Sequence, residues 1–359
     1  MKANAKSPSP RIVWDWGTAY DLFASLHVLH HPGSFGLRGA WAAGVRSRLS
    51  TTHRSILEDA QDLFFPPVAW LYTLPSPKDA ATVLWALGQI PAAERLPALG
   101  LNADHSNEYK AVLKEVADRR SWNDQDMERL RSIFQQRGRA VQPKAIVNIL
   151  DWWSRPDEFG ERYLEALQAY QAVFFAEEER RIRPFLQASL DQSQEAAKTL
   201  SFTKLIERLS QGLEIAELAE STEVVLAPSY WTTPLVVYAH LDAGRMILLY
   251  GCRPPEAALV PGEVIPDAML RALKALADPT RLRMMRYLAV EPLTPSQLST
   301  RLRLRAPTMI HHLNALRLAG LVHLSLDKQG EKRYAIRPER VADTFAVLQN
   351  FLSTEDLSK

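Results

Sequence analysis

The sequence predicts a mainly helical protein with a small β component: a helical N-terminal body, a short β region that completes this body, and a C-terminal winged helix-turn-helix. Three observations predict this fold class. Apolar residues recur at helical spacing from Trp14 to about Glu220. Runs rich in Val, Ile, Leu and Tyr follow between residues 222 and 251. The last quarter of the chain contains three helix-start patterns, followed by a strand, a turn and a second strand.

The N-terminal body is predicted from helical patterns that prolines and glycines interrupt. The expected organisation is a disordered tail at 1–10, a helical domain at 11–220, a β segment at 221–252, a linker at 253–264, a C-terminal domain at 265–352 and a tail at 353–359. Within the body, the sequence predicts helices at residues 20–29, 77–87, 108–116, 124–136, 143–153, 157–179 and 201–213, and strands at 222–226, 234–238 and 245–251.

The C-terminal domain contains two short helices whose starts are marked by capping residues. Asp278, followed by a proline, can accept the free N–H groups of a first turn, so a helix is expected over 279–289. Its expected apolar face consists of Leu282, Met285 and Leu288. Thr294 and Gln297 have the spacing of a capping box, which predicts a second helix over 295–303.

A third helix in this domain follows a link of only a few residues. Pro307 suits a first helical position, and Gly320 suits a left-handed cap at the other end. The expected buried stripe is Ile310, Leu313, Leu316 and Leu318. Two helices joined in this way form a helix-turn-helix, whose second helix lies in the major groove of DNA.

A wing and a final helix complete the predicted domain. Residues 321–326 and 332–336 read as two strands joined by a turn at 327–330. A helix then starts at Pro338, with an apolar face made of Val341, Phe345, Leu348 and Leu352. A terminal helix with such a face often pairs with its symmetry mate.

Double-stranded DNA is the partner that the charge distribution favours. Residues 265–352 contain 14 Lys and Arg against 7 Asp and Glu, a net charge of +7, whereas the remaining chain has 29 against 34, a net charge of −5. The residues predicted to face base edges are Thr308, Met309, His311, His312 and Asn314, although some of them must pack inward. The predicted phosphate contacts are Arg301, Arg303, Arg305, Lys328, Lys332 and Arg333.

The C-terminal domain resembles the ArsR/SmtB family of bacterial winged-helix repressors. The matching segments are residues 276–282, Gln297-Leu298, Pro307-Thr308, His311-His312-Leu313, 316–322 and 330–334. This resemblance implies a homodimer that binds an inverted-repeat operator, usually as a repressor that an effector releases. The upstream region resembles the long N-terminal extensions of some repressors of this family, on the segments 14–17, 42–46 and 226–229.

Metal sensing and catalysis are not expected, and no cofactor is expected. Family members that sense metals use cysteine thiolates near the helix-turn-helix, or His and carboxylate ligands on the last helix. This chain has a single cysteine, Cys252, and its last helix offers only Glu339 and Asp343. His27, His30 and His31 lie near Asp21 in the sequence, but no zinc-protease, phosphate-loop, dinucleotide or nucleophile-elbow motif is present. We therefore expect the protein not to be an enzyme.

Three interpretations of the body remain open. It senses a small non-metal ligand, it is a dimerisation or partner-binding scaffold without an effector, or it is the catalytic half of a bifunctional regulator. Its many aromatic residues suit either an apolar pocket or an ordinary core. Arg46 and Arg48 near Trp41, or Arg155 beside Trp152, are the candidate anchors for an acidic ligand. Without a membrane-length apolar run or a signal peptide, we expect a soluble, cytoplasmic protein.

Overall fold

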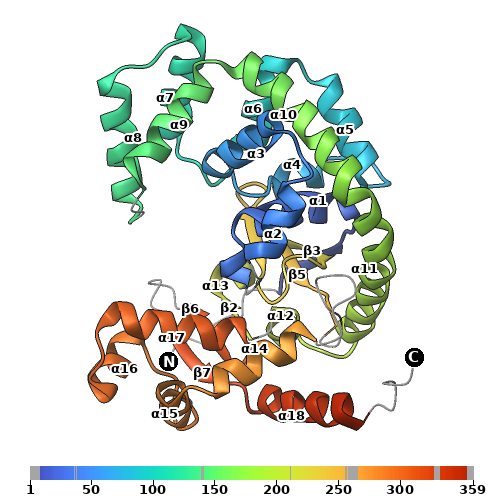
Figure 1. Cartoon of the computed structure of the whole chain (residues 1–359), viewed down its shortest axis with the longest axis vertical. Coiled ribbons are helices and arrows are strands. Elements are labelled where there is room, and N and C mark those ends of the chain that lie inside the picture. The colour runs from blue at the N-terminus through green and yellow to red at the C-terminus, as the bar shows by residue number, and fades with distance from the viewer. Residues whose placement is uncertain are drawn as a thin grey trace, which may run out of the picture.

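The predicted fold class is confirmed by the computed structural model, a mainly helical chain with small sheets (Figure 1). The structure describes residues 9–35, 37, 39–138, 141–210, 212–254, 257, 266–326 and 332–353. The body consists of α1 (Thr18–His30), η1 (Pro32–Phe35), α2 (Gly39–Arg46), α3 (Thr51–Leu63), α4 (Val68–Tyr72), α5 (Ala80–Gln89), α6 (Ala92–Gly100), α7 (Asn107–Arg119), α8 (Asp124–Gln136), α9 (Pro143–Trp153), α10 (Pro156–Tyr170), the π-helical turn η2 (Gln171–Phe175), α11 (Ala176–Ala197), α12 (Phe202–Leu209) and α13 (Ala216–Glu220).

A four-stranded sheet lies at the base of this helical body. Its strands are β1 (Arg11–Trp14), β3 (Glu223–Ser229), β5 (Arg245–Gly251) and β4 (Val237–His240), in that spatial order. β1, β3 and β5 are parallel, whereas β4 runs antiparallel to β5. The prediction missed β1, which was assigned to the helical domain, because a four-residue strand at the end of a polar tail gives little period-two signal.

The two central strands are buried on both faces, so the sheet separates two hydrophobic cores. Successive side chains of a strand point to opposite faces. On the face toward the main helical body lie Val225, Ala227, Ile247 and Leu249. On the other face, Val224, Leu226, Met246, Leu248 and Tyr250 pack with residues of α12 and α13. This double coverage explains why these strands read as continuous apolar runs in the sequence.

A buried carboxylate ties α1 to the end of β3. Asp21 accepts hydrogen bonds from the hydroxyl of Ser229 at 2.7 Å and from the backbone N–H of Trp231 at 2.8 Å. Burial raises the pKa of Asp21 to about 6, although these hydrogen bonds act in the opposite direction. Asp21 is therefore a structural link, and it is not aimed at the histidines of α1 as a metal ligand would be.

From Pro279 onward, the C-terminal module has the helix and strand order that the sequence predicted, whereas its first helix, at Asp267–Leu276, was not predicted. It contains α14 (Asp267–Leu276), α15 (Pro279–Leu288), α16 (Pro295–Leu302), α17 (Ala306–Leu318), β6 (Val322–Leu326), β7 (Lys332–Ile336) and α18 (Pro338–Ser353). β6 and β7 are antiparallel, as expected of a wing, and the predicted turn at 327–330 lies outside the described residues. Residues of α14, α15, α16, α17 and both strands pack in one apolar core.

Several predicted boundaries in the body were wrong. The helix expected over 157–179 is interrupted by η2 and continues through α11 to Ala197. The sequence did not predict α2, α3, α4, α6 or α13, because short helices with prolines and glycines between them give weak periodicity. α12 ends at Leu209 instead of Leu213, because the chain then turns into a strand that leaves the body.

That strand joins the body to the wing. β2 (Glu214–Ile215) pairs in parallel with Ser325 and Leu326 of β6. Just before it, Gly212 has a φ of 90°, and a side chain there would place its Cβ 2.6 Å from the Cβ of His323. The sequence predicted a linker at 253–264 as the connection between the two parts. The wing is also held directly by the body, through a three-stranded sheet that both parts build.

No helix in the described part of the chain has the length and apolar character that crossing a bilayer requires.

Candidate nucleic-acid interface

The helix-turn-helix is held by the capping interactions that the sequence predicted. The carboxylate of Asp278 accepts a hydrogen bond from the backbone N–H of Arg281 at 2.9 Å. Thr294 and Gln297 form a complete capping box, with reciprocal hydrogen bonds of 3.2 and 2.9 Å. Arg303 adopts a left-handed conformation with a φ of 55°, which ends α16 and turns the chain toward α17. These contacts fix the direction in which α17 leaves the turn.

The packing of α17 determines which of its residues are accessible. Met309, Leu313 and Leu316 are buried at helical spacing in the core of the module. The prediction that Met309 faces DNA was therefore wrong, since its exposed fraction is 0%. The prediction that Ile310 is buried was also wrong, since its exposed fraction is 50%. Both errors amount to a rotation of the helix by one residue, which a run of two adjacent apolar residues cannot settle.

The polar candidates on α17 differ in their exposure. Thr308, His311 and Asn314 are exposed and lie on the side away from the core. His312 is half-buried, and its Nδ1 has no hydrogen-bond partner among the described residues. Ile310 is an additional accessible residue that the sequence reasoning missed, and an exposed aliphatic side chain can contact a thymine methyl group.

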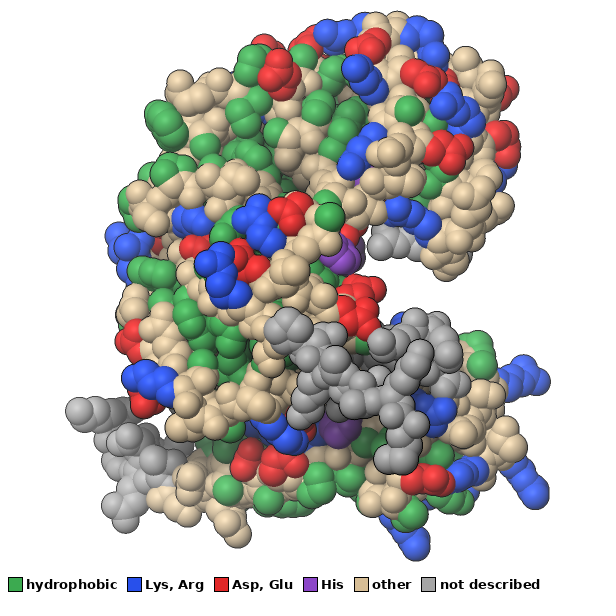
Figure 2. Space-filling view, turned by 180° about the vertical axis from the view of Figure 1, so that it is seen from behind, with side chains coloured by type: hydrophobic (Ala, Val, Ile, Leu, Met, Phe, Trp, Pro, Cys, Tyr) green, Lys and Arg blue, Asp and Glu red, His purple; other side chains and the backbone are tan. Residues whose placement is uncertain are grey.

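The predicted phosphate contacts also divide into groups. Arg303 and Arg305 are exposed at the start of α17, and Lys332 is exposed at the start of β7. Arg301 instead donates to Glu291 at 2.6 Å and lies over the ring of Tyr287. Arg333 is half-buried, and Lys328 lies outside the described residues. Figure 2 shows Lys and Arg side chains protruding from the end of the module that carries α15 and α16.

Part of the accessible face of α17 lies opposite the body. A hollow of about 480 Å³ is lined on one side by five residues of this helix, and on the other by Gly33 and Ser34 of η1. The five residues are His311, Asn314, Ala315, Arg317 and Leu318. Two of the predicted base contacts therefore face another part of the same chain across a hollow whose volume is too small to hold a DNA duplex.

The last helix leaves part of its apolar face uncovered. Phe345 and Leu352 of α18 have exposed fractions of 49% and 72%, and Val341 and Leu348 are half-buried beside them. The predicted apolar face is therefore present but has no complete partner within the described chain. Contiguous exposed apolar side chains are typical of an interaction surface.

Two of the predicted ligand anchors in the body serve internal contacts, whereas Arg48 is exposed. Arg46 donates to the carbonyl oxygen of Leu29 at 2.6 Å, and Arg155 donates to Glu158 at 3.0 Å while lying over the ring of Trp152. Trp41 stacks on the buried Trp231, as an ordinary core residue does. Within the described residues, no three His, Cys, Asp or Glu side chains are grouped to hold a metal ion.

Comparison with known proteins finds a family similarity within the C-terminal module. Residues 278–323, which run from the cap of α15 through α16 and α17 into the wing, match the bacterial regulatory proteins of the arsR family. The search of curated proteins and the search of solved structures found no match.

Proposed function

Because residues 278–323 carry an ArsR-family helix-turn-helix, which supports a role as a DNA-binding transcriptional regulator, we propose that the chain acts as a dimeric repressor. In this proposal, α17 and the wing bind an inverted-repeat operator in double-stranded DNA, and the N-terminal body senses a small non-metal ligand. The exposed row of Thr308, His311 and Asn314 on a module of net charge +7 carries the proposal. We assign no catalytic role to the body.

The proposed dimer pairs two C-terminal modules through α18. Its support is the uncovered apolar face around Phe345 and Leu352, for which a second copy offers an identical, self-complementary surface. Two modules related by a twofold axis would present their α17 helices to half-sites about 34–36 Å apart along the duplex. This geometry explains why an inverted repeat is the proposed operator.

We propose further that the conformation described here is the one that does not bind DNA. With Gly33 and Ser34 opposite the C-terminal half of α17, a duplex cannot approach His311 and Asn314 without a movement of the module relative to η1. A ligand that binds one of the two arrangements more tightly would shift the population between them. Because η1 stands opposite α17 in one of these arrangements, the proposed ligand would change the fraction of the protein that can bind DNA.

Fluorescence anisotropy tests the proposal with the full-length protein and labelled DNA from its own promoter region, at two salt concentrations. Saturable binding that survives an excess of unrelated DNA is the expected result. The double variant His311→Ala, Asn314→Ala should lose this specific binding and keep the salt-dependent background. Binding that follows only the salt concentration, and is the same for unrelated DNA, would contradict the proposed function.

A scaffold role without an effector is the alternative for the body, and the β2–β6 pairing favours it. In that case the body would hold the wing in one fixed position. Its operator affinity would then be the same in the presence and absence of every candidate ligand.

A further inference from the structure

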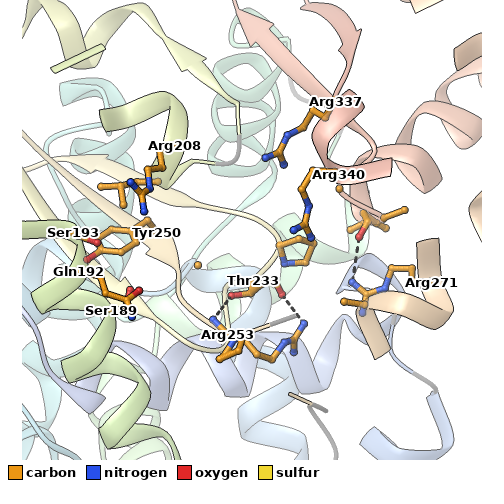
Figure 3. Close-up of a pocket in the computed structure, with 18 residues that line it drawn as sticks. Ser189, Gln192, Ser193, Arg208, Thr233, Tyr250, Arg253, Arg271, Arg337 and Arg340 are labelled. Carbon is orange, nitrogen blue, oxygen red and sulfur yellow. Dashed lines mark hydrogen bonds between the residues drawn. The ribbon is translucent and has the colours of Figure 1, made fainter. Parts of the chain in front are cut away.

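A cavity of about 290 Å³ lies at the junction between the body and the C-terminal module (Figure 3). The body contributes α11, α12, the loop between β3 and β4, and the end of β5 with the residues that follow it, and the module contributes α14, the end of α17 and the start of α18. Neither part alone builds the cavity. Its polar and charged lining consists of Ser189, Gln192, Ser193, Arg208, Thr233, Tyr250, Arg253, Arg271, Arg337 and Arg340.

The lining is strongly cationic. Its 18 residues include five arginines and neither an aspartate nor a glutamate. Arg337 and Arg340 have carboxylate partners outside the cavity, Glu339 at 3.1 Å and Asp343 at 3.3 Å, and both carboxylates are largely exposed to solvent. Among the described residues, Arg208, Arg253 and Arg271 have no ion pair with a carboxylate. The charge of Asp267 in α14 acts against that of Arg253 and Arg271, but its carboxylate does not line the cavity, so among the described residues the lining keeps an excess of positive charge.

Arg253 is the most deeply buried of the five. Its exposed fraction is 8%, and its guanidinium donates to the carbonyl oxygen of Thr233 at 3.2 Å. Its Nη1 is buried and has no partner among the described residues. Arg271 has the same deficit: one nitrogen donates to the carbonyl oxygen of Leu318 at 3.2 Å, while Nε and Nη2 are buried without a described partner.

The unpaired nitrogens converge from different elements. Figure 3 shows Arg337 and Arg340 extending toward Thr233 from the module, with Arg253 beside Thr233 and Arg271 at the edge. Arg337 Nη1 and Arg340 Nε are also buried without a described partner. Burial, together with the charge of Arg271, lowers the pKa of Arg253 to about 10, and burial beside Arg340 lowers the pKa of Arg337. Buried charges of one sign are costly unless a counter-charge accompanies them.

We propose that this junction cavity binds a small polyanion, a phosphorylated or multiply carboxylated compound, held by Arg253, Arg271 and Arg340. Guanidinium groups suit this ligand class because their planar N–H donors match the oxygens of phosphates and carboxylates in paired hydrogen bonds. The cavity is at the lower end of the size range of ligand sites, about 300–1,000 Å³, so the ligand is compact. Ser189, Gln192 and Ser193 at the far end provide hydroxyl and amide groups for its uncharged part.

The position of the cavity separates this ligand from operator DNA. Leu318 at the C-terminal end of α17 lines the cavity, whereas the proposed base-reading residues Thr308, His311 and Asn314 come earlier on that helix and do not line the cavity. At 1.5 Å per residue, Asn314 lies about 6 Å and Thr308 about 15 Å from Leu318 along the helix axis, so the cavity lies beyond the base-reading row.

Binding in this cavity would fix the module relative to the body. A ligand that bridges Arg253 of the body and Arg271 of α14 stabilises the arrangement in which η1 faces α17. Resting on the proposed function, the regulatory part of the inference is that the polyanion lowers operator affinity. Thermodynamic linkage requires that operator DNA weaken polyanion binding by the same factor.

Isothermal titration calorimetry of the full-length protein tests the site, with sodium pyrophosphate and sodium citrate as separate probes at an ionic strength held constant with sodium chloride. We expect one site per chain for at least one probe.

Arg253→Gln and Arg271→Gln should each weaken binding about tenfold to a hundredfold, the loss typical of a hydrogen bond between charged groups. Arg183→Gln, an exposed arginine of α11 outside the cavity, is the matched control and should bind like the wild type. Thermal unfolding establishes that each variant is folded, and Arg340→Gln replaces any variant that is not.

The outcomes separate the possible ligands and the two proposals. Binding of pyrophosphate alone assigns a phosphate ester, and binding of citrate alone assigns a polycarboxylate. Absence of binding by both probes, or equal weakening by Arg183→Gln, overturns the site. Loss of nonspecific DNA binding in Arg253→Gln also overturns it, because the cavity would then bind DNA phosphates. Anion binding in a protein that does not bind its promoter would leave the site standing and contradict the proposed function. Unchanged operator affinity with the probe bound would overturn the regulatory part.

Discussion

Individual residues of α17 illustrate where sequence patterns stop being decisive. Met309 and Ile310 are adjacent apolar residues, and either can begin a buried stripe that continues through Leu313 and Leu316. Packing of Met309 with Leu313 and Leu316 in the core of the module selects the rotation that buries Met309. Capping residues such as Asp278 and Thr294 could be predicted because their function depends on neighbours three positions away, whereas the rotation of a helix depends on the whole core.

The burial of Met309 and the exposure of Ile310 lead to a stability prediction. Met309→Ala should lower the free energy of unfolding of the module by about 2–5 kcal/mol, because it opens a cavity in the core. Ile310→Ala should change it by no more than about 0.5 kcal/mol, because its side chain is half exposed. Thermal or urea unfolding of the two variants is the measurement. Equal effects would mean that α17 is rotated differently in solution.

Two arginines near the turn should differ in their contribution to DNA binding. Arg305 is exposed at the start of α17, whereas Arg301 is paired with Glu291. Arg305→Ala should reduce the slope of log affinity against log salt concentration by about one unit, as the loss of one phosphate contact does. Arg301→Ala should leave the slope close to the wild-type value. The anisotropy titration at several salt concentrations measures both, and a larger loss for Arg301→Ala would show that its ion pair opens on DNA.

At the scale of elements, the sequence predicted those with strong local signals and missed those that depend on distant partners. α8 and α9 have the bounds that were predicted, because helical periodicity coincides with a capping box at the start of α8 and with a proline at the start of α9. β1 and β2 have four and two residues, and each exists only because a strand far along the chain pairs with it. Such pairing leaves almost no pattern in a segment this short.

The exposed face of α18 gives a prediction about assembly. Phe345→Asp should convert the proposed dimer into a monomer and abolish binding to an inverted repeat, because it places a charge in an apolar interface. Asn350→Asp adds the same charge to another side of the same helix and should leave the dimer intact. Light scattering coupled to size-exclusion chromatography measures the mass of each. A wild-type protein that is monomeric at every concentration tested would contradict the α18 dimer.

At the scale of the whole molecule, the sequence predicted the division into body and module but not the contact between them. Arg253, Arg271, Arg337 and Arg340 are scattered over almost 90 residues and carry no motif, so only the fold could bring them together. In the sequence, we instead looked for ligand anchors beside tryptophans. Of those candidates, Arg46 and Arg155 make contacts within the body. A charged cavity between two folded parts has no local signature.

The arrangement that we propose not to bind DNA, in which η1 faces α17, can be tested by cross-linking these two elements. In a Cys252→Ser background, cysteines replacing Ser34 and Ala315 stand on opposite sides of the hollow between η1 and α17. Joining them with a reducible bifunctional reagent should lower operator affinity at least tenfold, and reduction should restore it. The single-cysteine variants treated in the same way are the controls. Full affinity in the linked protein would mean that this arrangement already admits DNA.

The parallel pairing of β1 with β3 also constrains the order in which the chain acquires its structure during synthesis. Residues 11–14 are made first, but their partner at residues 223–229 is made more than 200 residues later. The first strand must therefore wait, unpaired, while most of the body emerges from the ribosome. The sheet is complete only when β5 has followed, shortly before the helix-turn-helix is translated. The strands of the body are therefore all synthesised before the DNA-binding module. The contact between body and module can then form as soon as that module folds.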